Sequence, residues 1–344
     1  MTTQRRHPPG RARQGAGART ATPAVPRPTR PVEPFRQVAL GDPPAGVTYP
    51  LTLRGAGYTW WRSLLGVGLA LLLYLVVTST VSSLVTGVGY ALEQPSQTLT
   101  EYAAAGRRFE LPIGMLAQNL AIAALTLTAW VVIWVVHQVR PRWLSSVHPG
   151  IRWRYLLLCV GAAAVILNGV ALIPTLTGSS PVDQIQPQPQ LLGFLIVILL
   201  TSPLQAAAEE YLFRGYLLQA LGSLVANPWF GVVVSATLFA FFHGGQNLPL
   251  FLNRLAFGLL AAALVLKTGG LEAGIAAHII NNVSAYTMAA LTTSIASLRA
   301  VRELTWLASS LNIAAFALFT AAALLIAHRL RLRTTTPAAI GSVR

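Results

Sequence analysis

Long apolar runs separated by short polar or basic stretches make up most of the chain. A helix needs about 20 apolar residues to cross a hydrocarbon layer about 30 Å thick, and most of these runs approach that length. We predict about eight transmembrane helices, at about residues 64–88, 111–136, 155–173, 191–224, 229–242, 250–266, 271–291 and 304–327. The fold class that follows is all-α, a polytopic membrane helix bundle.

The two ends of the chain lack this pattern. Residues 1–56 are rich in Arg, Pro, Gly, Ala and Thr and carry almost no periodic apolar positions, which is typical of a disordered tail. We therefore divide the chain into a disordered cytoplasmic tail (1–56), a transmembrane helical domain (57–333) and a short C-terminal tail (334–344).

Composition supports the membrane assignment. Hydrophobic residues make up 54% of the chain and charged residues only 10%, with a mean hydropathy of +0.57, which is too apolar for a soluble domain. The net charge of +15 would suit a nucleic-acid-binding protein, but the arginines cluster outside the apolar runs, as they do in cytoplasmic loops. We expect a multi-pass plasma membrane protein with both termini in the cytoplasm and no nucleic-acid partner. The single cysteine, Cys159, excludes an intrachain disulfide framework.

Two adjacent carboxylates and an arginine interrupt the fourth apolar run, at Glu209, Glu210 and Arg214. A charge at the centre of a membrane helix costs about 2.5–3.5 kcal/mol on insertion scales, so these residues are candidates for function. On a helix, Glu210 and Arg214 are four positions apart and can form a structural ion pair. Glu209 is rotated by about 100° and has no such partner on the helix. The spacing therefore predicts one structural carboxylate and one unpaired carboxylate.

Polar residues also interrupt the fifth and seventh runs. His243 ends the fifth run, and His278 and Asn282 lie four positions apart in the seventh, on one helix face. Each of these residues alone has a structural explanation, because His and Asn form hydrogen bonds between membrane helices. Their joint occurrence favours a site that Glu209, the two histidines and Asn282 form across three helices.

Three motifs carry a resemblance to a known family: Glu209-Glu210-x-x-x-Arg214, Phe239-x-x-x-His243 and His278-x-x-x-Asn282. In this order they resemble the motifs of the CAAX prenyl protease and bacteriocin-processing (CPBP) family of intramembrane proteases, also called the Abi family. The resemblance covers about residues 190–290, the expected catalytic core. It implies an intramembrane endopeptidase that hydrolyses a peptide bond of a membrane-associated substrate.

The resemblance also implies a role for each motif residue. Glu209 would be the general base that activates a water molecule, and His243 would help to hold and activate that water. His278 and Asn282 would donate hydrogen bonds to the developing oxyanion. The residues that would support the structure of the site are Glu210, Arg214 and Phe239.

A requirement for a metal is left open by the sequence. A glutamate and two histidines make a reasonable catalytic zinc set that leaves a fourth position for water, so the candidate Zn²⁺ ligands are His243, His278 and one of the two glutamates, with Glu209 the first choice. Against zinc, Glu209 cannot easily be both ligand and base, and the HExxH spacing occurs nowhere in the chain. We expect no other cofactor.

Two other classes of function remain as alternatives. The first is a non-catalytic membrane scaffold or immunity-type protein of the same fold. The second is a proton-coupled transporter, in which the buried glutamate and histidines would relay protons. Transporters often contain internal repeats, whereas this chain has no second copy of the Glu-Glu motif. For a protease, the expected partners are a membrane-anchored peptide or protein substrate and the lipid bilayer.

Overall fold

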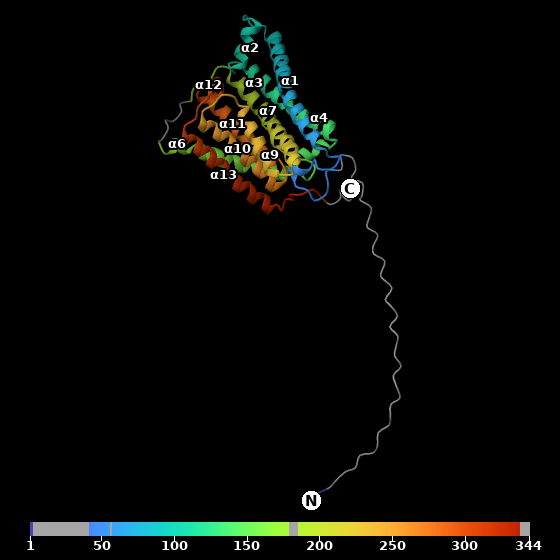
Figure 1. Cartoon of the computed structure of the whole chain (residues 1–344). Helices are drawn as coiled ribbons and strands as arrows, with labels where there is room; N and C mark the ends of the chain where they lie inside the picture. Colours follow the sequence, from blue (N-terminus) through green and yellow to red (C-terminus); the bar gives the residue numbers. More distant parts are fainter. Residues whose placement is uncertain (3–40, 56, 179–184, 338–344) are drawn as a thin grey trace. The chain divides into compact units, whose positions relative to one another are not determined.

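Helices account for the regular secondary structure of the part of the chain that the structure, a computed structural model, describes (Figure 1). The described residues are 1–2, 41–55, 57–178 and 185–337. The chain separates into two units, Met1–Gln37 and Val38–Arg344, and the helices of the described residues belong to the second. Between the described residues, extended pairing is limited to two isolated bridges.

All eight apolar runs form helices, and two of these consist of consecutive segments. The single long helices are α1 (Trp60–Glu93), α5 (Trp153–Ala171), α10 (Leu248–Thr268), α11 (Glu272–Thr292) and α13 (Trp306–Arg329). The segmented ones are α3 (Pro112–Ala123) with α4 (Leu125–His137), and α7 (Leu191–Glu210) with η3 (Tyr211–Leu217) and α8 (Leu218–Val225). The shorter elements are η1 (Tyr49–Leu51), α2 (Leu99–Arg107), η2 (Pro141–Leu144), α6 (Ile173–Leu176), α9 (Pro228–Phe241) and α12 (Ile295–Ala300).

The predicted fold class is confirmed. Within the described residues, six helices are long and apolar enough to cross a membrane, and α9 is a shorter apolar helix. The 21-residue helix α11 is not among the six, and it is the helix that carries His278 and Asn282. The protein is therefore a polytopic membrane protein whose polar helix lies inside the bundle.

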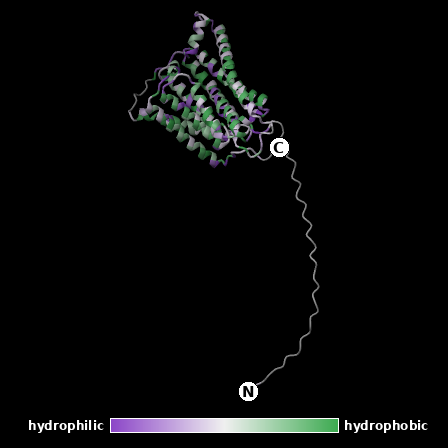
Figure 2. Ribbon diagram, viewed as in Figure 1, coloured by the Kyte–Doolittle hydropathy of each residue, from purple (hydrophilic) through white to green (hydrophobic). Residues whose placement is uncertain are grey.

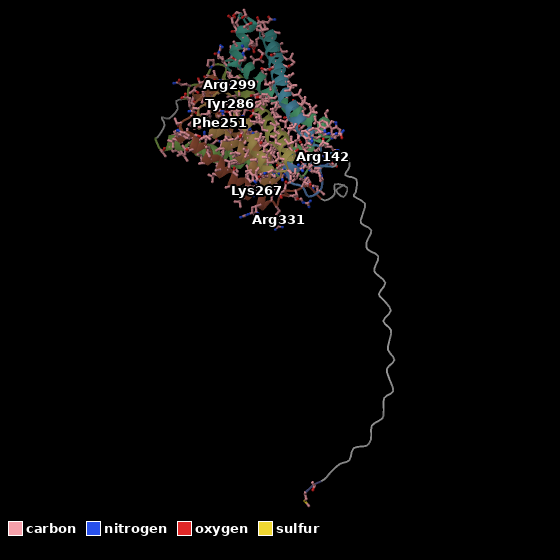
Figure 3. All side chains as sticks on the ribbon, in the orientation of Figure 1. Arg142, Phe251, Lys267, Tyr286, Arg299 and Arg331 are labelled. Carbon is pink, nitrogen blue, oxygen red and sulfur yellow. The ribbon has the colours of Figure 1, made fainter. Side chains whose placement is uncertain are left out.

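Large apolar side chains are exposed along the outer helices, and Figure 2 shows the hydrophobic colour along α1. Leu72, Leu75 and Leu84 of α1 are each more than half exposed, as expected for side chains that face lipid. Arg142 and Lys267 lie at helix ends, and in Figure 3 both are well separated from Arg299.

The central helices bring the three motifs together. Helix α11 packs against α7 and α5, and α3 packs against both α7 and α1. Helix α10 packs against α9 and α13, while α9 also contacts η3. Consequently the Glu-Glu motif at the end of α7 lies beside the histidine motif of α11 and the end of α9.

The predicted disordered tail ends earlier than residue 56. Residues 41–55 are described, and within them Tyr49 and Leu53 are buried in the main core. The Tyr49 hydroxyl donates to the carbonyl oxygen of Leu144. Two apolar anchors are too few to produce a periodic pattern, which is why the sequence suggested a tail. The rest of the predicted tail, residues 3–40, lies outside the described residues.

Part of the predicted C-terminal tail is also packed. Thr336 is buried, its hydroxyl donates to the carbonyl oxygen of Pro44 at 2.6 Å, and its backbone N–H donates to Val47 at 3.0 Å. Residues 338–344 lie outside the described residues.

A single carboxylate, that of Asp42, ties residues 41–55 to the loop after α4. It accepts hydrogen bonds from Arg140 at 3.0 Å, Arg142 at 3.2 Å and the Trp143 indole at 3.0 Å. Burial alone would raise the pKa of the Asp42 carboxyl, but the hydrogen bonds from Trp143 and Arg142 and the charges of Arg140 and Arg142 lower it below its ordinary value of 3.8.

We predict that Asp42→Asn lowers the free energy of unfolding by about 1 kcal/mol near neutral pH, because the charge-assisted hydrogen bonds are lost. The folded-state pKa of Asp42 is depressed, so its contribution is complete above 3.8 and is lost as the pH falls through the folded value. The difference between the wild type and the variant should therefore shrink in acid, as measured by thermal unfolding in detergent. Glu303→Gln, at an exposed position, should leave stability unchanged, and a pH-independent difference for Asp42→Asn would contradict the assignment.

Candidate active site

The Glu-Glu motif lies where the fourth long helix changes its geometry. Helix α7 contains Pro203 and ends at Glu210, and the following seven residues, Tyr211–Leu217, form a π-helical segment. Proline removes a backbone hydrogen bond, and π-helical turns inside α-helices occur frequently at functional sites. Glu209 and Glu210 are thus held between two irregularities of one continuous helix.

Glu210 and Arg214 form the ion pair that their spacing predicts. The Arg214 Nη1 atom lies 3.3 Å from Glu210 Oε1, and both side chains are fully buried. The guanidinium carbon lies 4.0 Å from the ring centroid of Phe239 and 5.2 Å from that of Phe257. Phe239 therefore contacts the arginine face, where a cation–π interaction stabilises the buried charge.

His278 lies between the two glutamates. Its Nδ1 is 2.9 Å from Glu210 Oε1, and its Nε2 is 3.3 Å from Glu209 Oε2. We expected His278 to donate to an oxyanion, but both ring nitrogens are directed at carboxylates, so this role does not fit the arrangement. His278 thus bridges the two carboxylates, and Arg214 supplies a positive charge beside Glu210.

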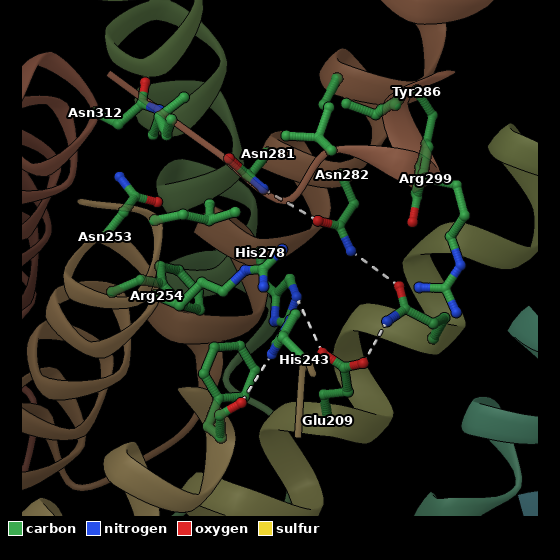
Figure 4. A pocket seen from close by; sticks show the side chains of 18 of the residues that line it. Glu209, His243, Asn253, Arg254, His278, Asn281, Asn282, Tyr286, Arg299 and Asn312 are labelled. Carbon is green, nitrogen blue, oxygen red and sulfur yellow. Dashed lines mark hydrogen bonds and ion pairs between the residues drawn. The ribbon is translucent and has the colours of Figure 1, made fainter. Parts of the chain in front are cut away.

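Glu209 also has a partner on its own helix, which the sequence interpretation missed. The side-chain amide of Gln205 donates to Glu209 Oε1 at 2.7 Å, and Gln205 Oε1 accepts from Asn282 Nδ2 at 2.9 Å (Figure 4). Gln205 precedes Glu209 by four positions, and this spacing in the sequence was the available signal. Gln205 therefore holds both the carboxylate and Asn282.

His243 follows the end of α9 and has a defined tautomer. Its Nδ1 lies 2.7 Å from the carbonyl oxygen of Phe239, and a carbonyl can only accept, so Nδ1 carries the hydrogen. In the neutral ring, Nε2 is then the acceptor. The ring packs edge-on against that of Phe239, with centroids 4.7 Å apart.

A cavity of about 360 Å³ is lined by all four predicted catalytic residues, Glu209, His243, His278 and Asn282. They come from α7, the end of α9 and α11, as predicted, and Figure 4 shows them facing one another. The volume is within the usual range for ligand pockets, about 300–1,000 Å³. Glu209 Oε2 is buried and, although His278 Nε2 lies 3.3 Å away, makes no hydrogen bond with the described residues, so this atom can accept one from a water molecule.

The expected zinc ligands do not form a metal site in this arrangement. No group of three His, Cys, Asp or Glu side chains in the described part of the chain is placed to hold a metal. Both nitrogens of His278 are directed at glutamates, so the remaining metal donors are His243 Nε2 and the Glu209 carboxylate, whose Oε2 already lies 3.3 Å from His278. Catalytic zinc usually has three protein ligands, so we derive no step through a metal.

Several polar residues that the sequence interpretation did not select also line the cavity. They are Asn253, Arg254, Tyr286, Arg299, Arg302 and Asn312. Arg254 lies inside the sixth apolar run, where the argument applied to Glu209, the cost of a charge in a membrane helix, would have identified it. Arg299 in α12 and Arg302 after it carried no such signal, because they are in a polar stretch.

Comparison with known proteins supports the resemblance of this region. Residues 191–284 match the model of a family described as type II CAAX prenyl endopeptidase Rce1-like, which confirms the resemblance carried by the three motifs. An uncharacterized protein, YyaK of Bacillus subtilis (strain 168), is 34% identical over 100 residues, which are 27% of this chain and 33% of that protein. The matched region thus spans about a third of this curated relative. No solved structure matches the chain.

We predict that Arg214→Met destabilises the protein strongly, by about 3–5 kcal/mol, because it leaves the buried Glu210 carboxylate without its cation. The double variant Arg214→Met/Glu210→Leu should lose less stability than the sum of the two single variants. Unfolding in detergent measures both effects. Arg329→Met, at an exposed position near the end of α13, is the matched control and should change little. Additive losses in the double variant would disprove the buried pair.

Proposed function

We propose that this chain, whose residues 191–284 match the Rce1-like CAAX endopeptidase family, is an intramembrane endopeptidase. The observation that carries the proposal is the convergence of Glu209, His243 and Asn282 on one cavity, with His278 holding the carboxylate. A scaffold would not need a carboxylate with an available oxygen beside the acceptor nitrogen of a histidine. The membrane location follows from the six apolar helices.

Hydrolysis would begin at a water molecule bound by Glu209 Oε2 and His243 Nε2. Glu209 takes one proton from the water molecule, and the water oxygen attacks the carbonyl carbon of the scissile peptide bond. Gln205 fixes the other carboxylate oxygen by its hydrogen bond to Oε1, so Oε2 is the atom that reacts. The carbon–nitrogen bond then breaks, and the proton held by Glu209 passes to the leaving amine.

The oxyanion that forms during the attack needs hydrogen-bond donors. We assign this role to Asn282, whose Nδ2 has a second hydrogen besides the one donated to Gln205. His278 instead acts through Glu209, because its nitrogens contact the two glutamates. Glu210 and Arg214 are structural, and Phe239 supports both Arg214 and His243.

The substrate in this proposal is a membrane-associated peptide or protein, and the lipid bilayer is its environment. The cavity is formed by helices that belong to the membrane bundle, so a substrate would reach it from the bilayer or its surface. We further propose a plasma membrane location with both ends of the chain in the cytoplasm, since the arginine-rich segments lie at those ends.

We predict that Glu209→Gln abolishes peptide release, with a loss of about 10²–10⁴-fold or more, because the general base is removed while the shape of the side chain is kept. The measurement compares the peptides that membranes release when they contain the wild type or the variant. Glu101→Gln, in the exposed capping box at the start of α2, is the matched control, since glutamine also serves at that position. Undiminished release by Glu209→Gln would contradict the catalytic assignment.

Treatment with a chelator should leave peptide release unchanged, because the donors that the cavity offers fall short of a catalytic zinc set. Elemental analysis of the purified protein gives a second measurement that does not depend on activity. Loss of release in chelator, restored by Zn²⁺ and accompanied by stoichiometric zinc, would show instead that His243, His278 and Glu209 rearrange to bind a metal.

A further inference from the structure

The cavity carries more positive charge than the proposed chemistry uses. Arg254 of α10, Arg299 of α12 and Arg302 of the following segment all line it. Among the described lining residues the sole carboxylate is that of Glu209, which His278 already contacts. Three guanidinium groups therefore surround a cavity whose one acidic group has its own partner.

These three arginines are positioned by neutral groups. Arg254 Nη1 donates to Gln246 Oε1 at 2.6 Å, and Arg302 Nη1 donates to the backbone carbonyl of Arg299 at 3.0 Å. The Arg299 guanidinium carbon lies 5.2 Å from the ring centroid of Phe109. None of the three forms an ion pair with a carboxylate of the described residues, so most of their donors stay available.

A fourth donor that lines the cavity has no acceptor. The side-chain nitrogen of Asn253 is buried, lines the cavity and makes no hydrogen bond within the described part of the chain. An unsatisfied buried donor costs about 1–3 kcal/mol, and proteins rarely keep one without a reason. Figure 4 shows Arg254, the next residue, extending toward the two histidines. At least one of these donors thus lies beside the catalytic groups.

We propose that Asn253, Arg254, Arg299 and Arg302 form a subsite for a carboxylate of the substrate close to the scissile bond; this rests on the proposed endopeptidase function. A planar guanidinium binds a carboxylate through two parallel hydrogen bonds, and a cleft of one charge concentrates ligands of the opposite charge. The carboxylate is either the C-terminal group of the substrate or an Asp or Glu side chain. A charged Arg254 inside the apolar helix α10 costs free energy, and the binding of a substrate carboxylate would explain why the helix carries it.

A peptide carboxylate suits this proposed subsite better than a lipid phosphate does. The arginines line the same cavity as Glu209, so a lipid headgroup bound there would occupy the space that the substrate needs. A carboxylate carried by the substrate itself would instead place the scissile bond beside Glu209 and His243.

The test measures binding of fluorescent apolar octapeptides to the full chain in nanodiscs, with Glu209→Gln as background so that no cleavage occurs. Three matched peptides are compared: one with a free C-terminus, one with a C-terminal amide, and one with the amide and a single internal Asp. We expect the peptide with the preferred carboxylate to bind about 10–100-fold more tightly than the neutral amide. Tight binding of the first or the third peptide identifies the source of the carboxylate.

Arg254→Gln should remove this preference without weakening binding of the neutral amide peptide. If that variant does not fold, Arg299→Gln and Arg302→Gln at exposed positions provide the same test, and Arg329→Gln is the control that should keep the preference. Equal binding of all three peptides overturns the proposal. The proposal is also overturned if Arg254→Gln weakens only the binding of vesicles that contain phosphatidylglycerol. That result would show that the arginines bind lipid headgroups.

This binding test is separate from the test of catalysis. A preference for carboxylate peptides that depends on Arg254 supports the subsite even if the wild-type chain releases no peptide. Conversely, peptide release that requires Glu209 but shows no carboxylate preference supports the endopeptidase and removes the subsite.

Discussion

Neutralisation of charge inside a helix bundle is the constraint on which the site depends. Glu209, Glu210, Arg214 and His278 are each costly in apolar surroundings, and each lies within 3.3 Å of an oppositely charged or hydrogen-bonding partner from this set. Removing one of them leaves another uncompensated. The packing of α7 against α11 is therefore tied to this cluster, because His278 crosses from one helix to both glutamates of the other.

The helix formed by α7, η3 and α8 gives the two glutamates of that cluster different roles. The change to π-helical geometry after Glu210 places Arg214 against Phe239 and Phe257, away from the cavity. Glu209 faces the cavity, and its Oε1 accepts a hydrogen bond from Gln205, one turn earlier on the same helix. One carboxylate is thus committed to structure, and the adjacent one retains an oxygen for chemistry.

The cavity combines two kinds of polar group. Glu209 and the acceptor nitrogen of His243 suit the binding and activation of water. The donors come from α10, α12 and the segment after α12, with Arg254 and Asn253 the most enclosed. A carboxylate of the substrate would be attracted to these donors, because a cleft of one charge concentrates ligands of the opposite charge.

The sequence alone was sufficient for the membrane bundle, for the ion pair of Glu210 with Arg214, and for the grouping of Glu209, His243, His278 and Asn282. Apolar run length and the spacing of four residues on a helix are local properties, and charges in apolar runs are rare enough to be noticed. Tertiary structure alone decided that His278 bridges both glutamates, that residues 41–55 belong to the core, and that arginines from two separate segments line the cavity. These depend on contacts between residues distant in the chain, which helical periodicity does not encode.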